Sequence, residues 1–398
     1  MEEWKECKLG DICKTNINSY SEKDNWSFVN YLDTGNITEN KISDIQFIDL
    51  SSESLPSRAR RKVQLNDIIY STVRPNQKHF GIIKNQPENF LVSTGFAVLH
   101  INKTIADPNF IFYNLIQNEN TESLHAIAEQ TTSAYPAIKP SDIENLSIKL
   151  PPLPTQQKIA AILSSIDDKI ELNNKINTNL ELQIEALLMN YISREETSSA
   201  KLGDYLYIKG RIGWKGLKKN EYLEKSNYRI INGETLTKAG IDWNKAGYIS
   251  EERYTESPEI MLQIGDILLS KDGTIGKIGY VDELELPTSV ASGIFVIRNN
   301  QPDVISTTFI YYLLKSKIFD SFIIARTEGS VIPHLYQKDF MDFDFPLPSP
   351  ELMNEFEKTT SPMFNQIINN LKENKKLTSL RDSLLPKLMN GEIEANKK

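Results

Sequence analysis

Near the middle of the chain lies the stretch Leu150-Pro-Pro-Leu-Pro-Thr-Gln-Gln-Lys-Ile-Ala-Ala-Ile-Leu-Ser-Ser-Ile-Asp-Asp-Lys169. Its prolines can continue neither a strand nor a helix, so they predict a stiff exit from the region before them. After them, seam positions alternate mostly at spacings of three and four, which predicts a long helix from about Thr155 to Glu195. The seam positions are Ile159, Ile162, Ile166, Ile170, Asn173, Asn177, Leu180, Ile184, Leu187 and Tyr191.

The same helix occurs a second time along the chain. From Pro136 onward the sequence repeats at a shift of 197 without gaps to the end of the helix. The last eight seam positions return as Met363, Ile367, Asn370, Asn374, Leu377, Arg381, Leu384 and Leu388. Asparagine in a seam weakens packing but fixes register and partner, so the matched asparagines predict that the helices pack on each other. A solvent-facing position for all four is the alternative.

The repeat extends to the region before each helix. Lys8-Leu-Gly-Asp11 returns as Lys201-Leu-Gly-Asp204, and Asn66-Asp-Ile-Ile-Tyr-Ser71 returns as Gly265-Asp-Ile-Leu-Leu-Ser270. Short runs rich in Ile, Val, Phe and Tyr predict strands, whereas residues 107–117 and 306–317 have helical apolar spacing. Each globule is therefore expected to be α+β.

The repeat and the length together predict the domain organisation. The 398 residues exceed what a single core usually serves. We predict an α+β fold with two globular domains separated by two long helices that form an antiparallel coiled coil, in a pseudo-two-fold internal repeat. The expected bounds are 1–152 for the first globule, 153–197 for the central helix, 198–350 for the second globule and 351–398 for the distal helix.

Positive charge is concentrated in two segments of an acidic chain. The net charge of −8 argues against a surface coated in positive charge, which many non-specific DNA binders have. Residues 56–84 nevertheless hold seven cationic side chains and one acid, and residues 201–219 hold six and one. Such local patches can attract DNA although the total charge is negative.

These segments, and one glycine-containing turn, contain residue types that can read DNA. Arg and Lys recognise guanine, Asn and Gln recognise adenine, and further cations contact phosphates. In the first globule the candidates are Arg58, Arg60, Arg61, Lys62, Arg74, Asn76, Gln77, Lys78 and His79. In the second globule they are Lys209, Arg211, Trp214, Lys215, Lys218 and Lys219, and, in a glycine-containing turn, Lys271, Thr274 and Lys277. An ordinary solvated surface is the alternative for each cluster.

Sequence motifs for catalysis on DNA are absent. Gly273-Thr-Ile-Gly-Lys277 lacks the spacing of a phosphate-binding loop, and neither a Gly-x-Gly-x-x-Gly pattern nor an amino-methyltransferase motif occurs. The four histidines are scattered, so none is favoured as a general base. We expect a chain that is not an enzyme and needs no cofactor.

The cysteines and the apolar runs limit the remaining classes. Cys7 and Cys13 have no His or Cys cluster beside them, which predicts free thiols and no metal site. No apolar run reaches the roughly 18 residues that span a bilayer, and the amino terminus lacks the pattern of a leader peptide. We expect a cytoplasmic protein.

The central stretch resembles the conserved region of type I restriction-modification specificity subunits. The resemblance covers nearly the whole chain, and its central motif is specific, whereas Leu-Gly-Asp alone would be weak. Its other parts are Trp4, Leu9-Gly-Asp11, Ser57-Arg-Ala-Arg-Arg-Lys62, Asp67-Ile-Ile-Tyr-Ser-Thr-Val-Arg-Pro75 and Leu384-Leu-Pro-Lys-Leu-Met-Asn-Gly-Glu-Ile393.

This resemblance implies a function and a set of partners. It implies two target recognition domains that each read half of a bipartite DNA sequence, and a coiled coil that sets the spacer and docks two methyltransferase subunits. Restriction translocase and nuclease subunits would join through the assembled complex. One departure is the second copy of the central motif, Pro348-Ser-Pro-Glu-Leu-Met-Asn-Glu-Phe356, which is degenerate. Docking at the two copies is therefore expected to be unequal.

Two other classes of function stay open from the sequence. One is an adaptor whose coiled coil binds proteins without any reading of DNA. The other is a nuclease whose motif is not recognisable. Specific affinity for DNA that falls with salt would separate a reader from an adaptor.

Overall fold

The computed structural model describes residues 4–130, 136–194, 196–212, 215–237, 240–327 and 334–393. The chain divides into two compact units. Unit 1 consists of Met1–Leu172 with Glu373–Lys398, and unit 2 consists of Asn173–Lys372. Each unit therefore combines one globule with a part of each long helix.

The globule of unit 1 is built on two sheets with the strand orders β2-β11-β8-β9 and β6-β3-β10-β7. The strands are β2 (Cys13–Thr15), β3 (Phe28–Leu32), β6 (Gln46–Asp49), β7 (Ala59–Lys62), β8 (Ile68–Ser71), β9 (Phe80–Ile82), β10 (Phe90–Ser93) and β11 (Phe96–Ile101). Two further pairs are β1 (Lys5–Lys8) with β12 (Ser147–Leu150) and β4 (Ile37–Thr38) with β5 (Lys41–Ile42). All four residues of β8 are buried, as expected for a continuous apolar run in the middle of a sheet.

Helices α1 (Pro108–Leu115), α2 (Asn118–Glu129) and α3 (Pro140–Glu144) complete this globule. The predicted start of α1 is confirmed, because the Asp107 carboxylate accepts a hydrogen bond from the Phe110 backbone N–H at 3.0 Å and Pro108 occupies the first helical position. The observed helix is shorter than the one predicted over residues 107–117, because α1 ends at Leu115 and α2 begins at Asn118.

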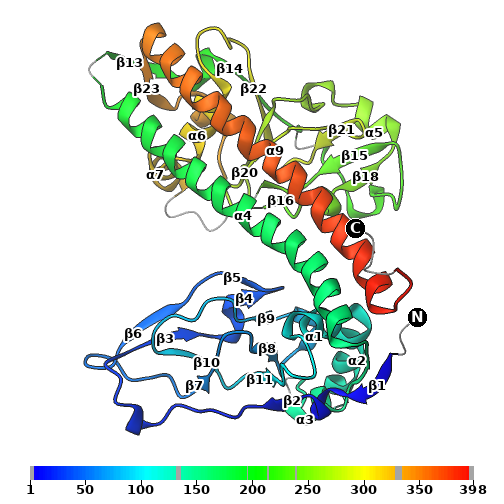
Figure 1. The fold of residues 1–398 in the computed structure, drawn as a ribbon. Coiled ribbons are helices and arrows are strands. Elements are labelled where there is room, and N and C mark those ends of the chain that lie inside the picture. Colours follow the sequence, from blue (N-terminus) through cyan, green and yellow to red (C-terminus); the bar gives the residue numbers. More distant parts are fainter. Residues whose placement is uncertain are drawn as a thin grey trace. The chain divides into compact units, whose positions relative to one another are not determined.

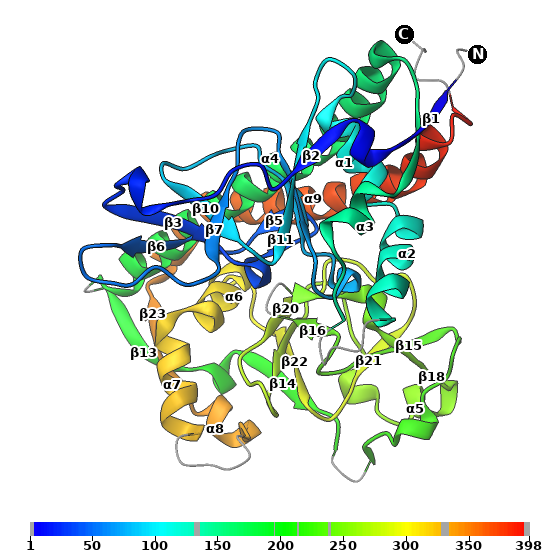
Figure 2. The ribbon, with the colours of Figure 1, turned by 90° about the horizontal axis from the view of Figure 1, so that it is seen from below.

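The globule of unit 2 repeats this arrangement, with the strand orders β14-β22-β19-β20 and β18-β15-β21. The strands are β13 (Thr197–Lys201), β14 (Leu206–Gly210), β15 (Tyr228–Ile231), β16 (Leu236–Thr237), β17 (Gly240–Ile241), β18 (Gly247–Ile249), β19 (Ile267–Ser270), β20 (Ile278–Tyr280), β21 (Thr288–Val290), β22 (Ile294–Asn299) and β23 (Asp344–Pro348). The helices are α5 (Glu251–Thr255), α6 (Thr307–Lys315), α7 (Lys317–Thr327) and α8 (Gln337–Met341). Within unit 2, α5 and α7 lie on different sides of β14 and β22 (Figure 2).

Strand pairing confirms the internal repeat. Ile69 faces Val98 in unit 1, and Leu268 faces Val296 in unit 2, close to the sequence shift of 199. The copies differ after β6 and β18: the chain of unit 1 continues to β7, whereas that of unit 2 forms α5. The α+β prediction is therefore correct, and the copies diverge within the globules, where the sequence shift also varies.

Helices α4 (Leu153–Ile192) and α9 (Pro350–Met389) are each 40 residues long and follow the two Pro-rich exits. This length corresponds to about 60 Å. Figure 1 shows α4 in green beside α9 in orange and red. The expected segments 153–197 and 351–398 start close to these helices, which end at Ile192 and Met389.

The two helices pack antiparallel, as predicted. In unit 2 the Asn370 side-chain amide donates a hydrogen bond to the Asn177 Oδ1 atom at 2.7 Å. Farther along α4, the Tyr191 ring lies 5.6 Å from the Phe356 ring of α9, centroid to centroid. Because the residue numbers rise along α4 while those of the partners fall along α9, the helices run in opposite directions.

The four seam asparagines are all buried. Asn173, Asn177, Asn370 and Asn374 are at most 9% exposed. The alternative in which they face solvent is therefore wrong. Their role in setting the register of the coiled coil remains a prediction.

Candidate nucleic-acid interface

A turn between β10 and β11 contacts both groups of candidates in unit 1, residues 58–62 and the loop that holds residues 74–79. The Thr94 backbone N–H donates a hydrogen bond to the Arg58 carbonyl at 2.8 Å. On the other side of the turn, the Thr72 backbone N–H donates to the Gly95 carbonyl at 2.8 Å. The structure thus brings Arg58 close to the loop between β8 and β9, residues 72–79, which holds the candidates from Arg74 to His79.

The β8–β9 loop presents several candidates to solvent. Arg74 begins a short 3-10 turn, Pro75–Gln77, and has a φ of 47°. The left-handed region is unfavourable for a residue with a side chain, and such residues are often found at functional sites. Arg74, Asn76 and Gln77 are exposed. This loop therefore offers one guanidinium and two amides at the surface.

Lys78 and His79 of this loop contact other parts of unit 1. The Lys78 Nζ atom lies 3.0 Å from the Glu39 carboxylate. The His79 Nδ1 atom lies 2.5 Å from the Ile37 carbonyl oxygen, so it donates to that oxygen in the tautomer that fits. These two side chains therefore attach the loop to β4 and the residue that follows it.

The candidates on β7 divide between its two faces. Lys62 forms an ion pair with Asp24 at 2.5 Å and lies 5.2 Å from the centre of the Trp26 ring. Arg61 points to the opposite face, as alternation along a strand requires, and burial lowers the pKa of its guanidinium. Arg60 is half-buried, whereas Arg58 is exposed. Of this group, Arg58 is the most accessible.

An acid that the sequence analysis missed lies beside the same turn. Asp33 accepts a hydrogen bond from the Tyr31 hydroxyl at 2.9 Å. Burial opposes ionisation of Asp33, but hydrogen bonds from the Thr34 backbone and the Tyr31 and Ser93 hydroxyls, with the charge of Arg58, lower its pKa. An ionised Asp33 can accept a hydrogen bond from a cytosine amino group. Only the fold brings Asp33 close to Arg58.

In unit 2 the loop between β19 and β20, residues 271–277, occupies the equivalent place. The Lys271 backbone N–H donates to the Gly293 carbonyl at 2.9 Å, as Thr72 does to Gly95 in unit 1. Gly273 and Gly276 have φ values of 66° and 92°, which glycine adopts without strain. The predicted tight turn is therefore present in the structure.

The side chains of this β19–β20 loop are unequally accessible. The Thr274 side chain is exposed. The Lys271 Nζ atom lies 5.1 Å from the centre of the Phe295 ring, and the Lys277 Nζ atom donates to the Gly233 carbonyl at 2.8 Å. The two lysines are half-buried.

Arg211 does not lie where the sequence prediction placed it. Its side chain is buried, with 2% exposed. Its guanidinium donates to the Val290 carbonyl at 3.1 Å and to the hydroxyls of Ser257 and Ser289 at 3.4 and 3.3 Å. Burial, together with the positive charge of Arg253, lowers its pKa. The structure does not favour a DNA contact for Arg211, because its guanidinium is buried and bonded inside unit 2.

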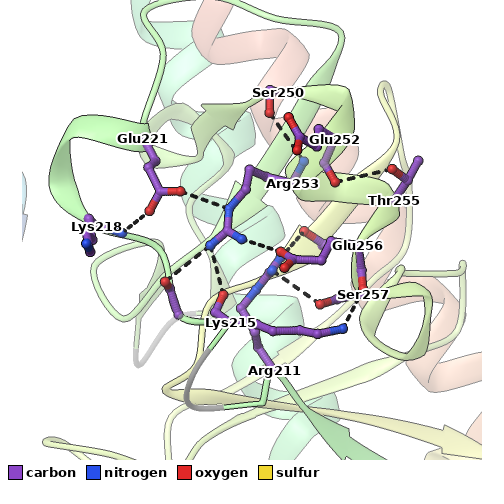
Figure 3. Close-up of polar contacts among 12 residues, drawn as sticks. Arg211, Lys215, Lys218, Glu221, Ser250, Glu252, Arg253, Thr255, Glu256 and Ser257 are labelled. Carbon is purple, nitrogen blue, oxygen red and sulfur yellow. Dashed lines mark hydrogen bonds and ion pairs between the residues drawn. The ribbon is translucent and has the colours of Figure 1, made fainter.

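The basic segment after Arg211 is held by a residue that the sequence analysis missed. Arg253 of α5 lies 3.1 Å from the Glu221 carboxylate and also pairs with Glu256 (Figure 3). Its guanidinium donates to the backbone carbonyls of Lys215 and Gly216 at 3.0 and 3.2 Å. Arg253 therefore fastens residues 215–221 to α5. It lies about 40 residues farther along the chain, and no local pattern predicts this contact.

Five candidates of the second globule remain to be placed. The Lys215 Nζ atom donates to the Glu256 carbonyl at 2.8 Å, so this lysine supports the segment. Lys209, Lys218 and Lys219 are exposed. Trp214 lies outside the described residues.

The described residues also bear on metal sites, membrane-spanning helices and reactive cysteines. Within the ranges that the structure describes, no group of His, Cys, Asp and Glu residues could hold a metal ion, and no helix is long and apolar enough to cross a membrane. Cys7 and Cys13 are free, and burial with the charge of Glu144 raises the pKa of the Cys13 thiol to about 12. That thiol is therefore protonated and unreactive near neutral pH.

Comparison with known proteins identifies the family. The model of the type I restriction modification DNA specificity domain matches residues 1–182 and 195–379. The chain is 26% identical to the type I restriction enzyme HindI specificity subunit of Haemophilus influenzae, over 99% of this chain and all of that protein. It is 25% identical to the MjaIX specificity subunit of Methanocaldococcus jannaschii, over 71% of this chain and 68% of that protein.

A solved structure shows the same fold. The type I restriction-modification S subunit from M. genitalium superposes with a TM-score of 0.59 at 20% identity, covering 97% of this chain and 96% of that one. Together with the two matches of the family model, this likeness accounts for the repeated globules and the paired helices. The chain belongs to the family of type I restriction-modification DNA specificity subunits.

Proposed function

We propose that each unit of this specificity subunit reads one half of a bipartite DNA target. The observation that carries the proposal is the equivalence of two loops. The β8–β9 loop and the β19–β20 loop each donate a backbone N–H to a glycine carbonyl, at Gly95 and at Gly293, and each holds candidate side chains. Divergent side chains on equivalent scaffolds are what two different half-sites require.

The exposed side chains fall into two kinds of contact. Arg58, Arg74, Asn76 and Gln77 of unit 1 and Thr274 of unit 2 can form hydrogen bonds to base edges. Lys209, Lys218, Lys219 and the backbone of the β19–β20 loop suit phosphates, which hold a protein in place without reading sequence. In this proposal residues 1–152 and 198–350 are the two target recognition domains.

The helices supply spacing and docking in this proposal. Residues 153–197 and 351–398 would set the distance between half-sites and bind two methyltransferase subunits. Methylation and cleavage would come from modification and restriction subunits in the assembled complex. The degenerate second motif at Pro348–Phe356 supports unequal docking at the two copies.

A salt titration separates this proposal from a protein-binding adaptor. The chain, assembled with its methyltransferase subunits, should bind one DNA sequence with an affinity that falls steeply as salt rises. An adaptor would show no sequence preference at any salt concentration. Mapping of methylated bases in cells that carry the complex would then give both half-sites and the spacer between them.

Replacement of Arg74 by alanine should weaken recognition of one half-site only. A bidentate contact from Arg to a base contributes about 1–3 kcal/mol of discrimination, so affinity for the target should fall roughly 5- to 150-fold. Sequence selection at the other half-site should not change. Lys103→Ala is the matched control, because Lys103 is exposed but follows the far end of β11. An equal loss at both halves would contradict the assignment.

Replacement of Arg253 by alanine should weaken binding without removing a phosphate contact. The segment 215–221 would lose the side chain that joins it to α5, and the ordering of Lys218 and Lys219 would then oppose binding. We expect about a tenfold loss of affinity and an unchanged slope of log affinity against log salt.

Two further variants serve as comparisons for Arg253. Lys218→Ala should reduce the salt slope by about one, and the exposed Lys225→Ala should change neither affinity nor slope. A reduced slope for Arg253→Ala would show that Arg253 itself contacts DNA.

A further inference from the structure

A polar cluster links α4, α9 and α1 within unit 1. The Arg381 Nη1 atom of α9 lies 2.9 Å from the Asp167 carboxylate of α4. The Tyr113 hydroxyl of α1 donates to the same carboxylate at 2.6 Å. The Asp167 and Arg381 side chains are 19% and 28% exposed, so water screens this pair only in part.

The equivalent positions of unit 2 are apolar. The shift of 197 relates Asp167 to Phe364 and Arg381 to Ile184. Phe364 and Ile184 are 6% and 0% exposed and belong to one buried cluster. Tyr312, the counterpart of Tyr113, lies 6.0 Å from the Phe364 ring, centroid to centroid. One charged pair in unit 1 is thus replaced by an aliphatic residue and an aromatic ring in unit 2.

The seam asparagines cannot explain why α4 pairs with α9. Asn173 and Asn177 of α4 recur as Asn370 and Asn374 of α9. If α4 packed antiparallel against α4 of a second copy in the same register, asparagine would again meet asparagine. The asparagines therefore select a register but do not distinguish α9 from another α4.

Asp167, Arg381, Ile184 and Phe364, which differ between the two helices, do distinguish α9 from a second α4. Pairing of α4 with a second α4 would place Asp167 opposite Ile184, and pairing of two α9 helices would place Arg381 opposite Phe364. Both arrangements leave a partly buried charge against an apolar side chain, which is unfavourable. We propose that Asp167, Arg381, Ile184 and Phe364 select the pairing of α4 with α9 and exclude helix pairs formed between two identical halves of this chain.

The Asp167–Arg381 pair should affect which helix is selected as partner more than it affects the stability of the helix pair. Replacing a partly buried ion pair by well-packed apolar residues is often neutral or stabilising. The variant D167F/R381I gives unit 1 the same residues as unit 2, so its helices should still pack. It should no longer distinguish α4 from α9 at these two positions, because every pairing there would then be apolar.

A nicked full-length protein tests this directly. A protease recognition sequence is inserted between the end of α4 at Ile192 and the start of β13 at Thr197, and the folded protein is cleaved there. Both halves are then present in equal amounts and can exchange partners when the complex is taken through its urea midpoint and returned to buffer. Native mass spectrometry distinguishes the mixed pair from pairs of identical halves by mass.

The two chains should give different distributions. The parent should return at least about tenfold more mixed pairs than identical pairs. D167F/R381I should approach a statistical mixture with about equal amounts of both kinds, and its thermal midpoint should be unchanged or higher. The exchanged variant D167R/R381D retains unlike charges and should behave as the parent does.

Three outcomes would overturn the proposal. They are a statistical mixture from the parent, an excess of mixed pairs from a stably folded D167F/R381I, and a lower midpoint of that variant without any change in pairing. If D167F/R381I does not fold, D167L/R381L replaces it, since leucine suits both seam positions. Where refolding from urea is incomplete, the halves are allowed to exchange without urea, at a temperature below the thermal midpoint. The same comparison is then made.

Discussion

A chain lengthened by seven residues after Lys175 and by seven after Lys372 is expected to read a longer spacer and to lose its original target. The two insertion points are equivalent at the shift of 197, and a heptad preserves the seam of a coiled coil. The rise of 1.5 Å per residue adds about 10 Å to each helix, which corresponds to up to about three base pairs.

The expected loss on the original target is large because one whole half-site goes out of reach. Each mismatched base pair already weakens a specific complex by about 1–3 kcal/mol. Affinity for the original spacer should therefore fall at least about a hundredfold, while a target with a longer spacer regains it. Binding to a set of DNA duplexes that differ only in spacer length measures both effects.

A single insertion provides the control for this experiment. Seven residues added only after Lys175 leave α9 at its original length, so the two seams no longer match along the whole helix pair. That variant should be less stable and should not gain affinity for a longer spacer. If the doubly lengthened chain still prefers the original spacer, the helices do not set the distance between half-sites.

Among the substitutions proposed for this chain, replacement of Phe356 by alanine should produce the largest loss in free energy of unfolding. Phe356 of α9 is fully buried, and its ring lies 5.6 Å from that of Tyr191 in α4 and 5.5 Å from that of Phe309 in α6, centroid to centroid. Truncation of a buried phenylalanine costs about 3–5 kcal/mol. Because Phe356 joins both long helices to the globule of unit 2, the packing of all three should weaken.

Urea unfolding of the chain measures the loss in free energy of unfolding, and thermal unfolding measures the shift of the midpoint. For a unit of this size, the loss of stability should lower the thermal midpoint by about 10 °C. Leu371→Ala is the matched control on the same helix, because Leu371 is 48% exposed and its truncation should change stability by less than about 0.5 kcal/mol. A loss below about 1 kcal/mol for Phe356→Ala would contradict the packing described for unit 2.

Much of the fold followed from short-range patterns. The apolar spacing after Pro151 predicts α4, and the same spacing 197 residues later predicts α9. Periodicity is a local property, since it depends on which residues lie three or four positions apart. The ends of the helices were less well predicted, because they depend on capping and on contacts with residues elsewhere in the chain.

The candidate site was predictable by segment but not by residue. Charge density draws attention to the segment that contains Arg211, yet a basic residue in such a segment can turn inward. Arg211 does so because β21 and the chain after α5 supply acceptors for its guanidinium. Arg253 and Asp33 were missed because their partners lie in other segments of the chain.

The sequence by itself determined that this chain is two copies of a globule followed by a long helix, since a repeat and a helical period are both visible in one dimension. Only the tertiary structure decided which charges are available to a ligand and which support the fold. It also decided that Asp167 meets Arg381 while their counterparts are packed in an apolar core. The physical reason is that burial and pairing of a charge depend on residues far away in the sequence, whereas the preference for helix or strand depends mainly on near neighbours.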